Sequence, residues 1–322
     1  MSTTDKIIEY IKSRGQVTPA DLSRHLGINR TATHRQINKL LGEQLIYKIG
    51  KPPKVFYLLS EEKKKTNVEE VDPKLKEIVE RNFLVISPAG ERRTGWSGFV
   101  YWCDKHKLPL EKTAREYQTT LSKYAQYKKG GLIDGRYKIK HTFDQIFVDQ
   151  VFYLDFYSLE RFGKTKLGQL LLYAKQSQSR DLIKELVDQI RPQVVSLLKR
   201  FKIEAVGYIP PTVKRETQLM KELERQLNLP LPTINLVKVK TPVAVPQKTL
   251  NKLEDRVENA RGTIVVDDNK KYKTILLIDD ALGSGATLNE TARKIKSQNL
   301  ARMIVGLAIT GSFSGFEVIS EV

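Results

Sequence analysis

The sequence predicts an α/β protein in which a domain built on a parallel sheet follows a small domain of three helices and two strands. Two observations support this fold class. From about residue 165 onward, helical segments alternate with short, almost continuously apolar segments, as is typical of parallel strands buried on both faces. In residues 1–60, three amphipathic segments precede two short segments rich in β-branched and aromatic residues.

Length and composition limit the classes of protein to consider. The chain has 322 residues, enough for two or three domains, and a net charge of +18. That charge is compatible with a polyanionic partner or with a lysine-rich solubilising surface. The single cysteine, Cys103, excludes an intramolecular disulfide and a cysteine-built zinc site, and we expect it to be a buried, inert thiol. No apolar signal segment or membrane span is present, so we expect a cytoplasmic protein.

The first sixty residues show the order helix, helix–turn–helix and two strands. Thr18 is expected to cap the second helix, with Pro19 in its first turn and Gly27 at its end. In the third helix, Ile37 lies on the apolar face and Arg35 on the opposite, polar face. The strands "LIYKIG" and "KVFYLL" are joined by the basic tip "KPP".

This order resembles a winged helix-turn-helix domain over nearly all of residues 1–60. Lysine and arginine number ten in this segment and aspartate and glutamate four, a local charge of +6. The resemblance implies double-stranded DNA as the partner, although a winged helix used only for protein contacts is the alternative. The residues implied to enter the major groove are Thr31, His34, Arg35 and Asn38. The residues implied to contact phosphates are Arg30, Lys39, Lys48, Lys51 and Lys54.

The next two segments predict structure more weakly. Residues 61–82 are expected to be a charged linker that runs into a short helix. Residues 83–150 are expected to be a mixed α/β connecting region, with helices in "GWSGFVYWCDKHKL" and "LEKTAREYQTTLSKYAQY". Strands are expected in "GRYKIKHTF" and "QIFVDQVFYLDFY". Aromatic residues interleaved with lysines could line a nucleic-acid surface, but we favour a core with a solvated face.

The segment "ILLIDDALGSGATL" in residues 151–322 carries the clearest chemical signal. Asp279 and Asp280 end an apolar strand, and a loop rich in glycine and hydroxyl residues leads into the next helix. In open parallel sheets, ligands bind beyond the carboxyl ends of strands. Backbone N–H groups at Gly283 and Gly285, with the helix N-terminus, suit a phosphate, whereas the carboxylates suit hydroxyl groups beside it. A sugar phosphate satisfies both halves of the segment.

Other phosphate-binding motifs fit less well. The P-loop pattern G-x-x-x-x-G-K-[ST] is absent from the chain. A dinucleotide-binding loop would need a third glycine, and its acidic residue would lie about 20 positions later rather than directly before the loop. A plain strand–turn–helix with two surface aspartates remains the structural alternative.

The segment resembles the phosphoribosyl-pyrophosphate (PRPP) motif of type I phosphoribosyltransferases, and residues 150–322 more widely resemble the ComF-like branch of that family. Supporting segments are "AVGYIPPTVKRETQ", "VPQKTLNKLEDRVENARGTIVV" and "LGQLLLYAKQSQSRDLIKEL". The resemblance implies that Asp279 and Asp280 hold the ribose 2′- and 3′-hydroxyls and, in an enzyme, are the catalytic residues that support the electron-poor ribose. The 5′-phosphate loop would be Gly283, Ser284, Gly285, Ala286 and Thr287. Pyrophosphate would lie at the turn formed by Pro210, Pro211, Thr212, Lys214 and Arg215, under a mobile loop with Lys248, Arg256 and Asn259. Mg²⁺ would be bound through PRPP, without a direct protein ligand.

Two departures from the family pattern bear on function. Gly283 and Ser284 stand where many members have two threonines, and a winged helix replaces the cysteine-rich zinc module common in ComF-like proteins. No pocket for a particular base is recognisable.

The two resemblances together give two leading hypotheses. The first is a PRPP-responsive DNA-binding regulator, similar in architecture to the PurR repressor of Gram-positive bacteria. The second is an active phosphoribosyltransferase, in which a nitrogen nucleophile displaces Mg-bound pyrophosphate from the ribose. An accessory role in DNA uptake or recombination is a weaker third hypothesis. We expect a homodimer, because helix-turn-helix proteins usually bind paired half-sites.

Overall fold

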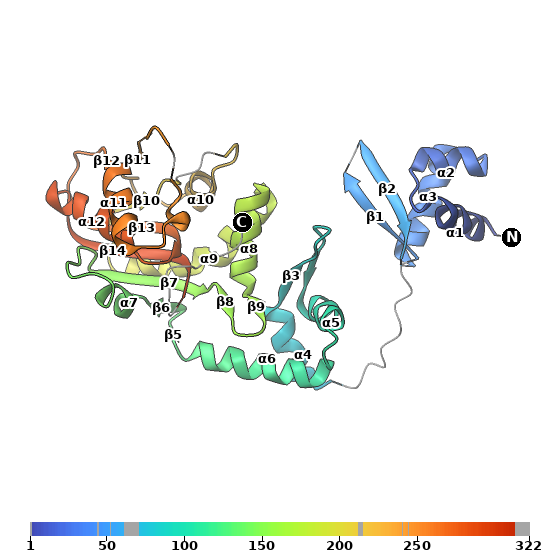
Figure 1. Ribbon diagram of the computed structural model, residues 1–322, viewed down its shortest axis with the longest axis horizontal. Coiled ribbons are helices and arrows are strands. Elements are labelled where there is room, and N and C mark those ends of the chain that lie inside the picture. The colour runs from blue at the N-terminus through green and yellow to red at the C-terminus, as the bar shows by residue number, and fades with distance from the viewer. Residues whose placement is uncertain are drawn as a thin grey trace. The chain divides into compact units, whose positions relative to one another are not determined.

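The computed structural model describes residues 2–43, 45–51, 53–60, 71–211, 215–239, 241–243 and 245–312. The chain divides into two compact units, Met1–Glu70 and Val71–Val322 (Figure 1). Within the described residues, no helix is both long enough and apolar enough to span a membrane.

The N-terminal unit has the predicted elements in the predicted order. Helices α1 (Thr3–Arg14), α2 (Pro19–Leu26) and α3 (Arg30–Gly42) precede the antiparallel strands β1 (Ile46–Lys51) and β2 (Lys54–Leu59). The Thr18 hydroxyl accepts a hydrogen bond from the Asp21 N–H at 3.2 Å, and Gly27 ends α2 in the left-handed conformation. A core that includes Ile7, Ile11 and Leu40 holds the helices together.

The larger unit begins with a helical region that has its own core. It contains α4 (Pro73–Asn82), β3 (Leu84–Ile86), β4 (Arg92–Thr94), α5 (Gly95–Lys105) and α6 (Leu110–Ala125). Phe83, Phe99 and Tyr117 pack against one another inside this core. Cys103 is buried there, and burial raises the pKa of its thiol to about 12, as expected for an inert cysteine. The aromatic pattern therefore forms a core with a solvated outer face.

A six-stranded sheet forms the centre of this unit, in the order β10-β13-β14-β7-β6-β5. Strands β10 (Ala205–Tyr208), β13 (Tyr272–Leu282), β14 (Ala301–Gly311) and β7 (Gln150–Phe156) are parallel. Strands β6 (Leu132–Asp134) and β5 (Lys128–Lys129) extend the sheet in antiparallel pairs. The mostly parallel sheet confirms the predicted fold class.

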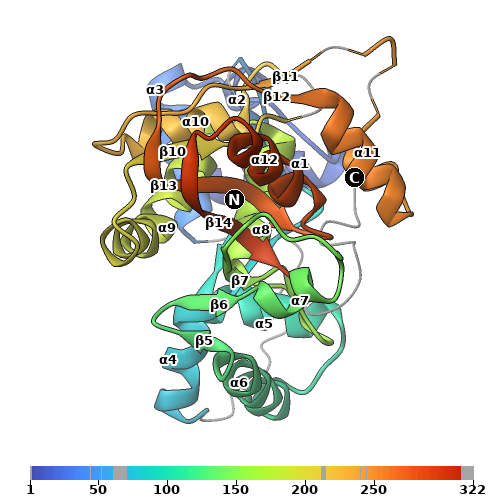
Figure 2. The same cartoon turned by 90° about the vertical axis from the view of Figure 1, so that its left-hand side faces the viewer.

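Helices cover both faces of the sheet, as Figure 2 shows from the side. On β13, Leu276 and Ile278 share a core with α8 (Lys166–Ser177), α9 (Arg180–Arg200) and α10 (Leu219–Leu227). The alternate residues Ile275 and Leu277 share the opposite core with α7 (Arg136–Lys140) and α12 (Ala286–Ser297). Helix α11 (Leu253–Thr263) packs on α12 and follows the short 3₁₀ helix η1 (Gln247–Thr249).

Two of the predicted strands do not belong to the main sheet. Strands β11 (Leu236–Lys238) and β12 (Ile264–Val266) pair with each other antiparallel. Their apolar residues match the pattern of a buried strand, but that pattern does not specify which partner a strand takes. A further small pair is formed by β8 (Ser158–Leu159) and β9 (Gly163–Lys164).

The strand predicted in "GRYKIKHTF" is wrong, because this segment forms α7. The Asp134 carboxylate accepts a hydrogen bond from the Arg136 N–H at 2.9 Å, which favours a helical turn directly after β6. Ile139 is then buried against the loop that follows β13. Tertiary packing thus overrides the strand propensity of the segment's β-branched and aromatic residues.

Candidate functional site

The candidate site lies at the carboxyl end of β13, the second strand of the sheet. Asp279 and Asp280 are both half-buried there, directly after the fully buried Ile275–Ile278. Asp279 pairs in register with Ala308 of the neighbouring β14, so the carboxyl ends of both strands reach the same edge. This is the edge at which ligands bind in open parallel sheets.

The loop that follows Asp279 and Asp280, together called the diacid, requires glycine at position 285. This residue has a φ of 83°, and a Cβ atom there would collide with the Ile139 side chain. Ser284 is buried, and its hydroxyl accepts a hydrogen bond from the Ala286 N–H at 3.3 Å. Helix α12 starts at Ala286, so its partial positive charge and first-turn N–H groups face this loop. The arrangement suits an anion.

The two carboxylates differ in their surroundings. The Asp280 carboxylate forms an ion pair with the Lys175 ammonium group on α8. Asp279 accepts a hydrogen bond from the Asp280 N–H at 2.8 Å. Burial, and then the neighbouring Asp280 charge, raise the pKa of Asp279 to about 7. Burial works against the charge of Lys175, but Asp280 raises the pKa of this lysine overall.

Two lysines from separate segments act on the diacid, and an arginine lies beside one of them. The Arg215 guanidinium donates a hydrogen bond to the Lys175 carbonyl oxygen, and Gln218 donates to the Arg215 carbonyl oxygen at 2.7 Å. On β11, burial lowers the pKa of Lys238 to about 8, while Asp279 partly opposes this effect. Lys175 and Lys238 were missed by the sequence prediction. For Lys175, the one signal in the sequence is a lysine in the last turn of an apolar helix, and such lysines are too common to identify a site.

The N-terminal unit presents a polar and basic surface on α3. Thr33, Ile37 and Leu40 of this helix are buried in the core. The residues predicted to contact DNA from α3 are all exposed: Arg30, Thr31, His34, Arg35, Asn38 and Lys39. Lys48 and Lys54 on the two strands are exposed as well, and Lys51 is the last residue of β1. The exposed face therefore has the composition of a nucleic-acid-binding helix.

Comparison with known protein families gives one match in each unit. Residues 1–47 match the family described as winged helix-turn-helix DNA-binding, and residues 217–313 match the family described as phosphoribosyl transferase domain. The second match contains the whole diacid loop. The chain joins a winged helix-turn-helix domain to a phosphoribosyltransferase-type domain.

A crystal structure of a hypoxanthine phosphoribosyltransferase from Staphylococcus aureus is similar at 13% sequence identity and a TM-score of 0.26. The similarity covers 43% of this chain and 70% of the other. No curated protein matches the sequence.

The structure places the remaining predicted residues of the phosphoribosyltransferase-type domain as follows. Pro210, Pro211 and Arg215 lie between β10 and α10, whereas Thr212 and Lys214 lie outside the described residues. Lys248 lies in η1, and Arg256 and Asn259 lie on α11. Arg256 is buried, and its Nε donates to the Leu250 carbonyl oxygen at 2.7 Å. Asn259 Nδ2 donates to the Val245 carbonyl oxygen at 3.1 Å, so both residues hold the preceding segment against α11.

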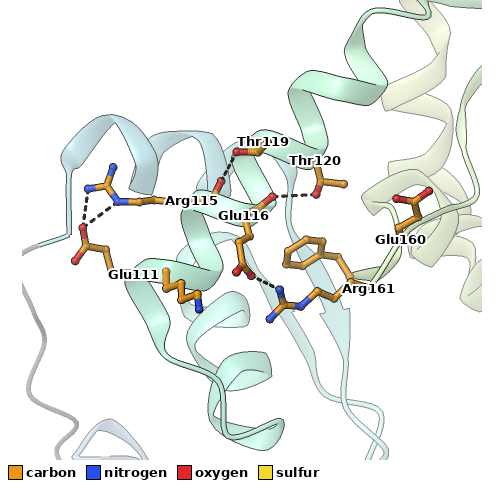
Figure 3. A pocket seen from close by; sticks show the side chains of 9 residues that line it. Glu111, Arg115, Glu116, Thr119, Thr120, Glu160 and Arg161 are labelled. Carbon is orange, nitrogen blue, oxygen red and sulfur yellow. Dashed lines mark hydrogen bonds and ion pairs between the residues drawn. The ribbon is translucent and has the colours of Figure 1, made fainter.

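A surface hollow of about 810 Å³ lies far along the chain from the diacid loop, on α6 of the same unit (Figure 3). Most of its charged residues are paired: Arg115 with Glu111, Arg161 with Glu116, and Glu160 with Lys123 beside the hollow. Since most of these charges are already matched, the hollow gives little reason to expect a charged ligand.

Proposed function

We propose that the protein is a DNA-binding regulator whose phosphoribosyltransferase-type domain binds PRPP, or a related sugar phosphate or nucleotide, together with Mg²⁺. The observation that carries this proposal is the combination of two sites in one chain. One is a diacid followed by a glycine loop at a helix N-terminus, and the other is an exposed basic helix in a winged helix-turn-helix domain.

Each part of the diacid site has a role in binding such a ligand. Asp279 and Asp280 would accept hydrogen bonds from the ribose 2′- and 3′-hydroxyls, and residues Gly283–Thr287 would surround the 5′-phosphate. Arg215 donates a hydrogen bond to the Lys175 carbonyl oxygen, and pyrophosphate would lie at the turn that Arg215 shares with Pro210 and Pro211. A pyrophosphate group, itself an anion, would compete with the Asp280 carboxylate for the Lys175 ammonium group.

The donor atoms of the site are compatible with Mg²⁺ bound through the ligand. Half-buried carboxylate oxygens are hard ligands of the kind that Mg²⁺ prefers, and Mg²⁺ commonly stays partly hydrated on substrate phosphates. Among the described residues, no group of three or more metal-ligating side chains forms a separate cage. When bound, the ion would neutralise pyrophosphate charge.

Regulation requires that the ligand binds more tightly to one DNA-binding state than to the other. The basic exposed face of α3 favours the regulator over an enzyme, because catalysis alone gives no reason to attach a DNA-binding domain. We propose a homodimer that binds paired half-sites on DNA. An active phosphoribosyltransferase remains the second candidate, since the same diacid loop would serve both activities.

A single experiment tests both candidates. The full chain is titrated against genomic DNA fragments in a mobility-shift assay, with and without PRPP and Mg²⁺, at several salt concentrations. Pyrophosphate is measured in the same tubes in the presence of a panel of bases. We expect DNA affinity to change with PRPP and no pyrophosphate to form. Steady turnover with any base would overturn the regulator, and DNA affinity insensitive to PRPP would remove its sensing role.

A further inference from the structure

Helix α7, from the region before residue 150, packs directly on the diacid loop. The Ile139 side chain is buried and occupies the space that a Cβ atom on Gly285 would need. At the start of the helix, a Cβ on Gly135 would come within 2.7 Å of the Leu282 Cδ2 atom. Gly135 N–H also donates to the Val151 carbonyl oxygen of β7 at 2.8 Å. These close contacts fix α7 relative to the loop, so the side chains of α7 have defined positions beside it.

Lys138 extends from α7 to the end of the sheet. Its ammonium group donates to the Ser312 hydroxyl at 2.9 Å and to the Ser312 carbonyl oxygen at 3.1 Å. It also lies 3.5 Å from the carbonyl oxygen of Leu282, the residue directly before the glycine loop. Within the described part of the chain, the ammonium contacts neutral oxygens and forms no ion pair with a carboxylate.

The surroundings of Lys138 are electropositive. Helix α12 begins beside the same loop with its positive end, and the buried Arg256 is close enough to act on Lys138 electrostatically. Burial, and then Arg256, lower the pKa of Lys138 to about 8, so the side chain is still mainly charged at neutral pH. A half-buried cation that lies within electrostatic reach of another cation and beside a helix N-terminus is stabilised by a bound anion.

We infer that Lys138 is a ligand-binding residue that donates a hydrogen bond to the 5′-phosphate of the sugar phosphate held by the Gly283–Thr287 loop. The inference rests on the proposed function, since it adds one side chain to the same site. It gives the region before residue 150 a direct part in ligand recognition. Lys138 would exchange its neutral partners at Ser312 for a phosphate oxygen when the ligand binds.

The test uses ribose 5-phosphate, which carries the 5′-phosphate without the pyrophosphate group. Binding to the full chain is measured by calorimetry for the wild type and for Lys138→Met, Lys138→Arg and Lys140→Met. Lys140 lies on the same helix and is exposed, so its variant is the matched control. Thermal unfolding of each variant shows whether the fold is retained.

We expect Lys138→Met to weaken ribose 5-phosphate binding roughly ten- to a hundredfold, as the loss of a hydrogen bond to a charged group would. Lys138→Arg should recover most of the affinity, and Lys140→Met should bind as the wild type does. If Lys138→Met binds like the wild type, the inference is wrong and the proposed function stands. If the wild type binds neither ribose 5-phosphate nor PRPP, the proposed function and the inference both fall.

Discussion

The Lys175 ammonium group on α8 forms an ion pair with the Asp280 carboxylate at the end of β13. Helix α8 lies on one face of the sheet. The contact therefore joins it to the strand end and loop that lead into α12 on the opposite face. It neutralises one of two adjacent like charges, while Asp279 keeps a pKa raised by burial and by Asp280. If the proposed ligand binds at these carboxylates, the stability of the site and its ligand affinity would be coupled through them.

Lys175→Met is expected to lower the free energy of unfolding, because it leaves Asp280 without its cation. Loss of a partner from a buried acceptor costs about 1–3 kcal/mol, and partial exposure of this pair favours the lower end. Urea unfolding at pH 7.5 measures the change. In a double-mutant cycle, adding Asp280→Asn to Lys175→Met should recover more than half of the loss. Additive effects of the two changes would show that the pair does not stabilise the fold.

Asp280→Asn is expected to weaken PRPP binding by roughly tenfold or more, since an amide is a poorer acceptor for ribose hydroxyls than a carboxylate. Calorimetry with Mg²⁺ and PRPP measures the change. Asp188→Asn, on an exposed position of α9, is the control and should bind as the wild type does. Equal affinity in all three proteins would mean that the diacid does not contact the ligand.

The raised pKa of Asp279 predicts how stability depends on pH. The folded state keeps this proton up to about pH 7, whereas the unfolded chain loses it near the ordinary value of 3.8. Between these values the folded state binds more protons, so this residue makes stability fall as pH rises. The melting temperatures of Asp279→Asn and the wild type are compared from pH 4 to 8. The melting temperature of the variant should rise relative to that of the wild type as the pH increases. A constant difference across this range would contradict the raised pKa.

Residues on α3 and on the wing, which is the antiparallel pair β1–β2, should affect DNA binding differently. Arg35→Ala should weaken the free energy of DNA binding by about 1–3 kcal/mol and relax sequence preference. The reason is that the side chain lies on the exposed face predicted to enter the major groove. Lys54→Ala should weaken binding to all sequences. It should also reduce the slope of log binding constant against log salt concentration by about one, because one phosphate contact is lost. Lys12→Ala, on the exposed side of α1, is the matched control. Identical salt slopes in Lys54→Ala and the wild type would exclude the wing from the DNA contact.

The diacid loop could be predicted from the sequence because its signals are local. An apolar run, two carboxylates and two glycines lie within fourteen residues, and β13 and α12 form as that spacing predicts. The same holds for helix α2, whose two caps, Thr18 and Gly27, are local signals.

The rest of the site depends on contacts between distant parts of the chain. Lys175 reaches Asp280 only because α8 and β13 share a core, and no pattern near Lys175 indicates that partner. Helix α7 was predicted as a strand, since its packing against Gly285 cannot be seen in its own residues. Propensity and periodicity describe segments, whereas convergence of charged side chains follows from topology.

Gly285→Ala tests whether the loop geometry depends on α7. The new alanine would have to keep a φ of 83°, which is unfavourable for any residue with a Cβ atom. Its Cβ would also collide with the Ile139 side chain. We expect a loss of about 1–3 kcal/mol in the free energy of unfolding and weaker ribose 5-phosphate binding. Gly262→Ala on α11, where the space around a Cβ is open, should instead stabilise by about 0.5–1 kcal/mol. Adding Ile139→Ala to Gly285→Ala removes the collision but not the backbone strain. If binding recovers more than stability in this double variant, the position of α7 controls the loop; if neither recovers, backbone strain alone explains the loss.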